Sequence, residues 1–253
     1  MKHFWFYLRE KIKFRIFRPM LLGIGRGMAR FATVPDRPVM DNRYFAWTRT
    51  LEAHWTEIRN EFLQLKKLQH LLPGIQDIQQ EQQVLNQDQN WKTFFLYGFG
   101  EKAELNCRLC PRTTDLLEDI PGMKTAFFSV ISAGKHIPAH KGLFKGIIRS
   151  HLGLIVPGRP GACRMRVAEE THPWEPGKVI VFDDTYDHEV WNDSHEARVV
   201  LLLDVERPFR PPWAGLNRAI IRWITHSSYV REAQEKHRQW EVEFHRNLGF
   251  FFV

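Results

Sequence analysis

Short apolar segments separated by turn residues dominate the chain beyond residue 123. Each segment is bounded by glycine, proline, aspartate or other turn-forming residues, which is the pattern of β-strands joined by loops. The pattern predicts strands at residues 123–132, 146–157, 163–168, 178–183, 188–191 and 197–205. Because no helical periodicity separates these strands, we expect a mainly β fold, an antiparallel sandwich or jelly roll, with flanking helices.

Helical periodicity occurs on both sides of this strand region. Apolar residues recur at spacings of four and three within residues 48–68 and predict an amphipathic helix packed on the core. Pro111 at a helix start and the stop at Pro121-Gly122 predict a short helix at 111–119. A further helical pattern covers roughly residues 214–245 and is followed by an apolar C-terminus.

These patterns divide the chain into one main domain with two extensions. A glutamine-rich loop is expected from Gln76 to Asn90, followed by an aromatic strand at 91–97. Within the main domain, a helical lead-in extends to about residue 122, and the jelly-roll core spans 123–208. The three parts are a basic amphipathic segment (1–30), the domain (31–210) and a C-terminal helical tail (211–253).

Composition supports a folded protein in a reducing compartment. The chain has 253 residues, 43% of them hydrophobic, which is enough for one large core and unlike a disordered protein. Three cysteines are too few for a disulfide-stapled secreted scaffold, and residues 1–30 lack the uninterrupted apolar stretch of a secretory signal. We therefore expect a cytoplasmic location.

The positive charge is concentrated at the N-terminus. Residues 1–30 hold eight basic residues against Glu10, which is 8 − 1 = +7 and equals the net charge of the whole chain. We therefore expect no nucleic-acid partner for the near-neutral remainder. On a helix, six apolar residues of this segment would share one side between flanking cations: Phe6, Phe14, Phe17, Leu21, Ile24 and Met28.

Such a helix would lie in the interface of an anionic membrane, on its inner face. A spanning helix is not expected, because no uncharged run approaches the roughly 18–20 apolar residues that a bilayer requires. The alternative is that the helix packs against its own domain.

Three histidines in the strand region are candidate metal ligands: His140, His151 and His188. A single histidine in a strand is usually a packed or surface residue. Iron oxygenases with a jelly-roll fold, however, hold Fe(II) with a His-x-Asp/Glu pair and a later histidine, and leave positions open for a cosubstrate and O₂. Alternate residues of a strand point to the same side, so such a pair can reach one ion.

Ordered motifs around these histidines resemble the aspartyl/asparaginyl β-hydroxylase family of Fe(II)/2-oxoglutarate dioxygenases. The similarity covers about residues 107–208, and its opening and closing motifs also resemble bacterial lipid A acyl-chain hydroxylases. The motifs are HIPAHKG at 136–142, RSHLGLIVP at 149–157, WEPGKVIVFDD at 174–184, HEVWN at 188–192 and Arg198 through Asp204-Val205. The resemblance implies a double-stranded β-helix, a cupin-like jelly roll.

The resemblance also implies the metal ligands and cofactors. His140 and His188, 188 − 140 = 48 residues apart, would hold Fe(II), with 2-oxoglutarate as cosubstrate and O₂ as oxidant. Gly142 stands where many dioxygenases have a carboxylate ligand, so the arrangement resembles the two-histidine site of the animal enzymes, with water able to fill the vacant position. Lipid A hydroxylases have an aspartate there.

Four further residues are implied in cosubstrate binding. His151 would belong to the 2-oxoglutarate pocket with Arg149 of the same strand face, and Arg166 is a weaker candidate for a carboxylate. Arg198 begins a continuous apolar strand, where a guanidinium needs an anion. The resemblance makes that anion the distal carboxylate of 2-oxoglutarate, whereas the alternative is a structural salt bridge.

Other reactive residues have structural interpretations. Asp183 and Asp184 precede a turn and are expected to shape it and to orient their neighbours. Cys107 and Cys110 lack the second pair of ligands that a zinc site needs, so Cys110 is expected to pack at the start of the Pro111 helix.

Three functions remain open on the sequence, and the first is slightly favoured over the second and strongly over the third. Hydroxylation of a membrane-lipid acyl chain agrees with the basic aromatic N-terminus and the apolar C-terminus. Hydroxylation of a peptidyl Asp or Asn agrees with Gly142 and with the residues at 188–191. Hydroxylation of an amino acid is the expectation if the N-terminal helix packs against its own domain. A non-catalytic jelly-roll binding module would not need the two histidines and Arg198 together.

Overall fold

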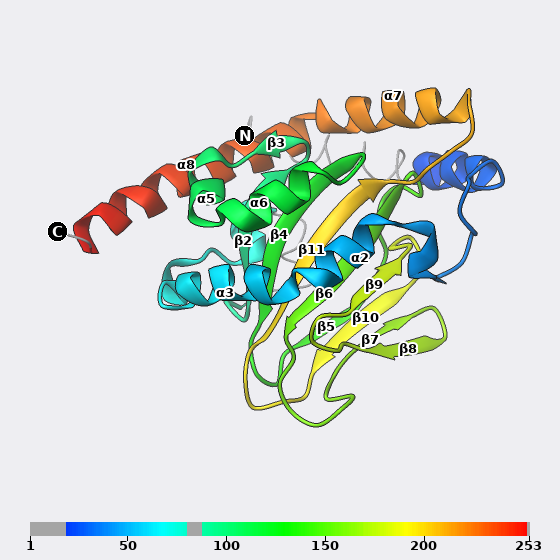
Figure 1. Ribbon diagram of the computed structural model, residues 1–253. Coiled ribbons are helices and arrows are strands. Elements are labelled where there is room, and N and C mark those ends of the chain that lie inside the picture. Colours follow the sequence, from blue (N-terminus) through cyan, green and yellow to red (C-terminus); the bar gives the residue numbers. More distant parts are fainter. Residues whose placement is uncertain (1–18, 80–87, 252–253) are drawn as a thin grey trace, which may run out of the picture.

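Two antiparallel sheets form the centre of the computed structural model, which describes residues 19–79 and 88–251 (Figure 1). In this part of the chain the larger sheet has the order β1-β9-β6-β11-β4-β2-β3 and the smaller has the order β5-β10-β7-β8. The strands are β1 (Val39–Met40), β2 (Trp91–Gly98), β3 (Glu101–Lys102), β4 (Met123–Ile131), β5 (His136–His140), β6 (Ile147–Ile155), β7 (Cys163–Val167), β8 (Glu170–Pro173), β9 (Val179–Phe182), β10 (His188–Asn192) and β11 (Arg198–Glu206).

The strand connections are those of a jelly roll. From β4 to β11 the chain crosses repeatedly between the larger and the smaller sheet, and β7 and β8 are the only consecutive pair of this series that stays in one sheet. The predicted fold class is therefore confirmed, and each of the six predicted strands lies within two residues of its observed bounds. The sequence pattern missed β5 and β8, which are the two edge strands of the smaller sheet.

Strand β5 shows why an edge strand is hard to predict. Its pattern alternates poorly, with Ile137 buried and its neighbours exposed, and it contains Pro138. Proline cannot donate to a neighbouring strand, so it is tolerated in a strand that has only one neighbour. By contrast, β11 is buried along almost its whole length between β6 and β4, as its continuous apolar run predicts.

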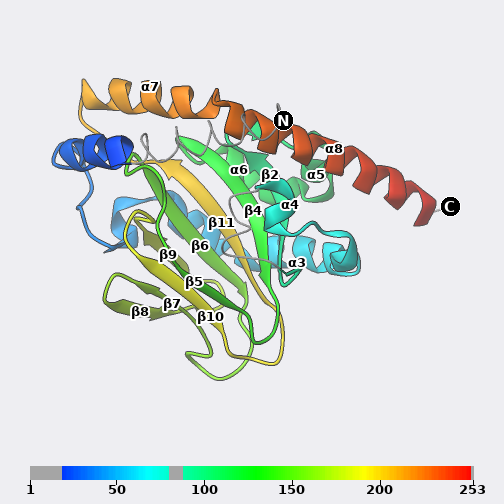
Figure 2. The ribbon, with the colours of Figure 1, turned by 180° about the vertical axis from the view of Figure 1, so that it is seen from behind.

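Helices cover the outer face of the larger sheet (Figures 1 and 2). The predicted helix at 48–68 is divided at His54 into α2 and α3, and its apolar positions Leu51, Ile58 and Phe62 are buried as expected. Between residue 41 and the start of β4, the helices are η1 (Asn42–Tyr44), α2 (Trp47–Ala53), α3 (Trp55–Lys66), η2 (Gln69–Leu71), α4 (Ile75–Ile78), α5 (Glu104–Leu109) and α6 (Pro111–Glu118).

Three of these helices bear on the sequence predictions. Helix α6 confirms the predicted helix at 111–119, with Pro111 in its first turn. Helix α4 lies at the start of the glutamine-rich stretch that we expected to be a loop, so that expectation is corrected there, while residues 80–87 lie outside the described part. The sequence pattern also missed α5.

The C-terminal tail is helical, as predicted, but consists of two helices. Helix α7 (Trp213–Thr225) is followed after a short break by α8 (Ser228–Phe251). Helix α8 packs its Trp240 and Phe244 against Phe94 of β2. The side chains of the apolar C-terminus, 250–253, lie outside the described part.

The N-terminal segment is described from residue 19, where a helix extends over 19–29. Leu21 and Met28 are buried in the protein, so the prediction that they face a membrane is wrong for these two residues, whereas Ile24 is exposed. The predicted apolar residues Phe6, Phe14 and Phe17 lie outside the described residues. Within 19–79 and 88–251, no helix has both the length and the apolarity needed to cross a membrane.

The cysteines occupy packed positions. Cys110 is fully buried directly before α6, as expected, and Cys163 is buried at the start of β7. Cys107 and Cys110 are free thiols, and burial raises the pKa of both.

Candidate active site

His140 and His188 are brought together by the pairing of β5 with β10. His140 ends β5, His188 begins β10, and the two residues are direct partners in the antiparallel register. Their imidazole rings lie with centroids 4.0 Å apart and are tilted by 50°. The two histidines predicted to share an ion, 188 − 140 = 48 positions apart, are thus neighbours.

Backbone hydrogen bonds fix the orientation of both rings. Nδ1 of His140 lies 2.9 Å from the carbonyl oxygen of Pro138, and Nδ1 of His188 lies 3.0 Å from that of Tyr186. Because a carbonyl only accepts, each Nδ1 carries the proton and donates, and each Nε2 keeps its lone pair. Burial lowers the pKa of both histidines, which favours the neutral form that binds a metal.

Asp184 fills the space beside Gly142. A Cβ atom added at Gly142 would overlap the Asp184 carboxylate, and the Gly142 N–H donates to the backbone oxygen of Asp184 at 2.6 Å. Asp184 is buried, and this burial raises its pKa to about 7 although Arg149 lies nearby. The loop between β9 and β10 thus fills with the Asp184 carboxylate the space that a side chain at position 142 would need.

The two aspartates before β10 have different roles. Asp183 shapes the loop as expected, since it accepts a hydrogen bond from the Thr185 N–H at 3.0 Å. It is also paired with Lys145 at 2.8 Å and with Arg207, all three being buried. Asp184 points toward Gly142 instead, and its place near the histidines could not be inferred from the sequence. Among the described residues, no group of three or more His, Cys, Asp or Glu side chains is arranged to hold a metal.

Arg149 lies near the histidines but is held by two acidic side chains. Its guanidinium donates to both carboxylate oxygens of Asp204, at 2.8 and 3.0 Å, and lies 3.4 Å from Asp184. Burial opposes the charge, but these carboxylates raise the pKa of Arg149 above its ordinary value. Arg149 thus holds Asp184 beside Gly142, and its guanidinium is not free to bind a further carboxylate in the same way.

A second group of polar side chains is buried next to the histidine pair. Arg198 is 1% exposed and its guanidinium lies 4.3 Å above the ring of Trp174. His151 is also buried, with its ring 5.7 Å from Trp174 and 5.1 Å from Phe182. Phe182 lies 5.6 Å from His188 between ring centroids, so the two groups are in contact through one aromatic ring.

Several polar atoms of this second group lack hydrogen-bond partners among the described residues, and most of them are donors. These atoms are Nε and Nη1 of Arg198, both ring nitrogens of His151, and Nε1 of Trp174. Burial lowers the pKa of Arg198 to about 9 and that of His151 well below its ordinary value. A buried polar atom without a partner costs about 1–3 kcal/mol, and a carboxylate would satisfy several at once. The donor set therefore fits the distal carboxylate that the resemblance assigns to 2-oxoglutarate.

Arg166 is the one candidate that the structure does not bring to this site. Met165 and Val167, its neighbours in β7, are buried in the core, so Arg166 faces the other side of the sheet. Its guanidinium donates to Asp187 at 2.9 Å and to Glu189 at 3.0 Å. The sequence shows that residues alternate along β7, but it does not show which of the two sides faces the interior. The predicted role of Arg166 depended on that choice.

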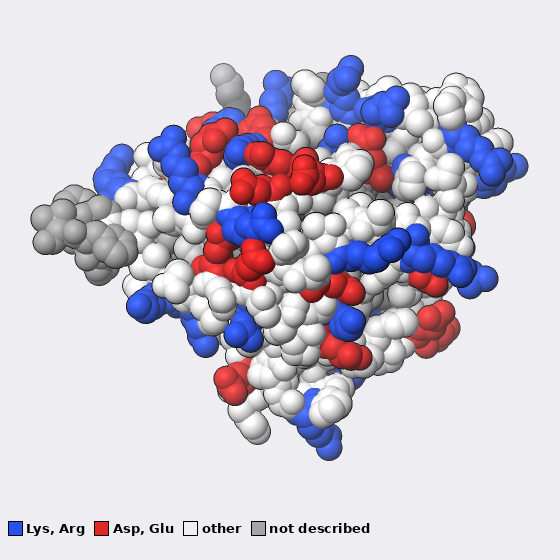
Figure 3. All heavy atoms as spheres, in the orientation of Figure 1, with Lys and Arg blue, Asp and Glu red and all other residues white. Residues whose placement is uncertain are grey.

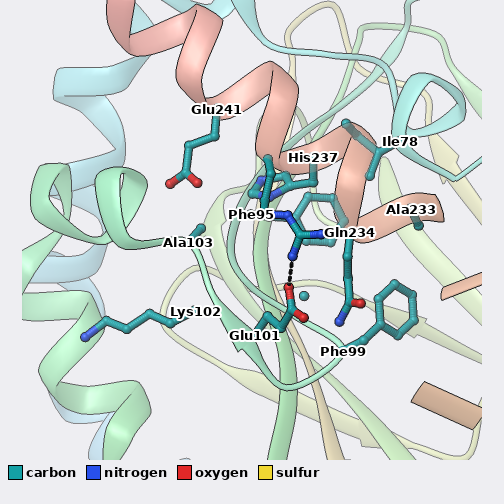
Figure 4. A pocket seen from close by; sticks show the side chains of 12 residues that line it. Ile78, Phe95, Phe99, Glu101, Lys102, Ala103, Ala233, Gln234, His237 and Glu241 are labelled. Atoms are coloured by element: carbon teal, nitrogen blue, oxygen red, sulfur yellow. Dashed lines mark hydrogen bonds and ion pairs between the residues drawn. The ribbon is translucent and has the colours of Figure 1, made fainter. Parts of the chain in front are cut away.

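A separate cleft lies between the β2–β3 hairpin and α8 (Figure 4). Arg238 and Glu101 close part of it with an ion pair of 2.9 Å. Glu241 accepts hydrogen bonds from the backbone N–H groups of Leu105 and Asn106 at the start of α5, both at 2.9 Å. These polar groups thus hold the helices in place, at the edge of the larger sheet where β2 and β3 lie.

Comparison with known proteins identifies the family of this chain. Residues 52–208 match the family model described as "Aspartyl/Asparaginyl beta-hydroxylase", which is more than half of the chain. The chain belongs to the aspartyl/asparaginyl β-hydroxylase family. The protein is therefore a hydroxylase, as the sequence motifs predicted.

Two curated relatives have different substrates in their names. The chain is 38% identical over 222 residues to the ornithine lipid ester-linked acyl 2-hydroxylase of Rhizobium tropici, and the match covers 88% of this chain and 79% of that protein. It is 34% identical over 176 residues to the human aspartyl/asparaginyl β-hydroxylase, covering 67% of this chain and only 22% of that protein. The match to the lipid hydroxylase thus extends over most of both chains.

Solved structures are more distant. A cupin domain of an XRE family transcriptional regulator from Enterobacter cloacae is 13% identical, with a TM-score of 0.32, and covers 46% of this chain and 96% of that one. The jelly-roll assignment follows from the strand order of this chain.

Proposed function

We propose that this β-hydroxylase family member uses Fe(II) and 2-oxoglutarate, with His140 and His188 as the iron ligands. The proposal rests on the pairing of these residues across β5 and β10 and on the Nδ1 hydrogen bonds that leave both Nε2 atoms with a lone pair. When bound, Fe(II) would couple the oxidation of 2-oxoglutarate by O₂, which gives succinate and CO₂, to the insertion of the second oxygen atom into an unactivated C–H bond of the substrate.

Arg198 is the residue that we assign to the distal carboxylate of 2-oxoglutarate. This assignment rests on the Nε and Nη1 atoms of Arg198, which are buried without hydrogen-bond partners. Both atoms would donate to the distal carboxylate, next to His151 and Trp174. A planar guanidinium fixes the direction of a carboxylate through two parallel hydrogen bonds. Phe182, between His151 and His188, would keep water out of the space where the cosubstrate joins the iron.

Arg149 and Asp184 have a positioning role in this proposal. Arg149 is held by Asp204, and it in turn holds the Asp184 carboxylate in the space beside Gly142. We therefore assign Arg149 to the wall of the site rather than to direct contact with 2-oxoglutarate. Arg166 is left out of the site, because Asp187 and Glu189 already bind its guanidinium on the other face of β7.

A lipid acyl chain is the substrate that we favour. The relative with this kind of substrate in its name matches along 79% of its length, whereas the human β-hydroxylase matches along 22%. Peptidyl Asp or Asn remains the second candidate, because Gly142 gives this chain the two-histidine pattern of the animal enzymes. We place the protein in the cytoplasm, on the inner face of the membrane, in agreement with its free thiols and basic N-terminus.

The substrate class is tested by product analysis. The purified protein is incubated with Fe(II), 2-oxoglutarate and O₂, with either acyl lipids in vesicles or peptides containing Asp and Asn. We expect succinate formation coupled to a product heavier by one oxygen in the lipid sample. Oxygen incorporation into the peptide alone would select the second candidate, and succinate formation in neither sample would contradict the proposed chemistry.

A further inference from the structure

The helix at 19–29 and α7 lie side by side along one edge of the protein (Figures 1 and 2). Leu21 of the first helix and Ile221 of α7 pack together on Phe144. This small cluster fixes the two helices to each other and to the domain, although they are about two hundred residues apart in the sequence. They therefore present one joint surface.

Large apolar side chains are exposed on this surface. Among the described residues, six large hydrophobic side chains are substantially exposed, and four of them belong to these two helices: Met20, Ile24, Leu216 and Trp223. Trp223 is the most exposed of the six, at 52%. A groove between the helices is lined entirely by apolar residues, namely Met20, Leu21, Ile24, Ala219, Ile220 and Trp223.

The two segments that carry these apolar side chains also carry exposed arginines, and they contain no acidic residue. Residues 19–35 and 208–231 contain six arginines and no Asp or Glu. Five of these arginines flank the two helices and are exposed: Arg26, Arg30, Arg210, Arg218 and Arg222. In Figure 3 the upper right edge, where α7 and the helix at 19–29 lie, is largely white and blue. The sequence just before this surface, residues 1–18, adds six basic residues and one acidic residue.

The surface adjoins the histidine pair. The loop that follows His140 runs directly beneath the two helices, with Phe144 in their shared cluster. The next residue, Lys145, contacts Gly25, where a Cβ atom would come within 2.8 Å of the lysine side chain. The carbonyl of Gly146 then accepts a hydrogen bond from Asn217 of α7 at 3.0 Å. The surface thus lies at the end of the jelly roll where β5 ends and β10 begins.

We propose that the helix at 19–29 and α7 form a docking face for a lipid bilayer that contains anionic lipid. Trp223, Ile24 and their apolar neighbours enter the acyl boundary, while the surrounding guanidinium groups contact anionic head groups. The charge selects a membrane over an apolar protein partner, because the two segments that form the apolar groove carry exposed arginines and no acidic residue. Docking does not depend on iron, but its use in presenting an acyl chain to His140 and His188 rests on the proposed function.

Vesicle co-sedimentation of the full chain, without iron or 2-oxoglutarate, tests the apolar part of this face. Vesicles of phosphatidylcholine with phosphatidylglycerol should bind the protein, and vesicles of phosphatidylcholine alone should bind it less. Replacing both Ile24 and Trp223 by serine should weaken partitioning at least about tenfold, because two large side chains no longer leave water. The matched control replaces Tyr44 and Val242, which are 39% and 50% exposed but lie elsewhere, and should bind as the parent does.

The charged part is tested with arginine variants. Replacing Arg218 and Arg222 by glutamine should weaken binding about thirtyfold at low salt, at roughly 1 kcal/mol for each cation near an anionic surface. Replacing the exposed arginines Arg49 and Arg108 should have little effect. Equal losses in the test and control variants would overturn the proposal, and so would a dimer in solution that the serine variant converts to a monomer.

Spin labels locate the bilayer directly. The three native cysteines are buried, so a label can be attached selectively at a new surface cysteine. A label at Leu216→Cys should become accessible to dissolved oxygen and protected from a water-soluble relaxant when vesicles are added, whereas a label at Val242→Cys should stay in water. A label at 216 that remains in water overturns the docking face even if succinate forms. Docking without succinate would instead contradict the proposed chemistry.

Discussion

Replacement of Arg198 by methionine tests whether Arg198 binds the carboxylate of 2-oxoglutarate or only stabilises the fold. Arg198 is buried without partners for Nε and Nη1, and burial lowers its pKa from 12.5 to about 9. This fall means that the charge is disfavoured by about 5 kcal/mol in the protein without an anion. Methionine fills a similar volume without charge. The free energy of unfolding of Arg198→Met should therefore equal that of the parent or exceed it by about 1–3 kcal/mol, which makes the variant as stable as the parent or more stable.

Binding of 2-oxoglutarate should change in the opposite direction. Loss of one partner of a buried, hydrogen-bonded charge pair costs at least about 2 kcal/mol, so affinity for 2-oxoglutarate should fall at least about thirtyfold. Arg198→Lys should also weaken binding, because an ammonium cannot make the two-pronged contact. Urea unfolding measures the first effect, and calorimetric titration of 2-oxoglutarate into the Fe(II)-loaded protein measures the second.

Arg207 provides the matched control. It is equally buried, at 1%, but its guanidinium is paired with Asp183 and Nε donates to the Lys145 carbonyl at 2.7 Å. Arg207→Met leaves a buried carboxylate with one fewer partner and should cost about 3–5 kcal/mol of stability. If Arg198→Met costs as much as Arg207→Met and leaves the affinity for 2-oxoglutarate unchanged, Arg198 is a structural residue and the reasoning fails.

Three further outcomes are expected. Gly142→Asp should not supply a third iron ligand but should lower stability and iron content, because its side chain would overlap Asp184; an increase in bound iron would contradict this. Burial lowers the pKa of His237 to about 4, so its stabilising effect is present above about pH 6.5 and is lost as pH falls toward 4. Between pH 6.5 and 4 the free energy of unfolding of His237→Gln should therefore fall by about 3 kcal/mol less than that of the parent. Urea unfolding at several pH values measures this difference, and an unchanged pH profile would refute it. Deletion of residues 1–18 removes a net charge of +5, six basic minus one acidic, and should weaken co-sedimentation with anionic vesicles at low salt; unchanged sedimentation would show that this segment adds nothing.

The jelly roll could be predicted because its central strands carry their own signal. Strand β11 is buried between two neighbours, so its continuous apolar run follows from its position. Strand β5 is an edge strand with Pro138 and exposed neighbours, and its pairing with β10 depends on the tertiary fold. The division of the helix at His54 is likewise a local break that apolar spacing does not reveal.

The candidate site was predictable where side chains follow strand alternation or the family motifs. His140, His188 and Arg198 belong to this group. The place of Asp184 was not predictable, because the direction of a loop side chain and the free space at Gly142 depend on how the two segments meet. The partner of Arg149 depends on register, since Asp204 lies directly opposite it on β11.

Iron binding by the histidine pair is tested most directly by metal content and 2-oxoglutarate turnover in His140→Ala and His188→Ala. Both variants should fold, lose Fe(II) and form no succinate, while His136→Ala on the same strand should retain both properties, because His136 is exposed and bonded to Glu189. Full iron content together with parental succinate formation in either His140→Ala or His188→Ala would contradict the assignment of this site.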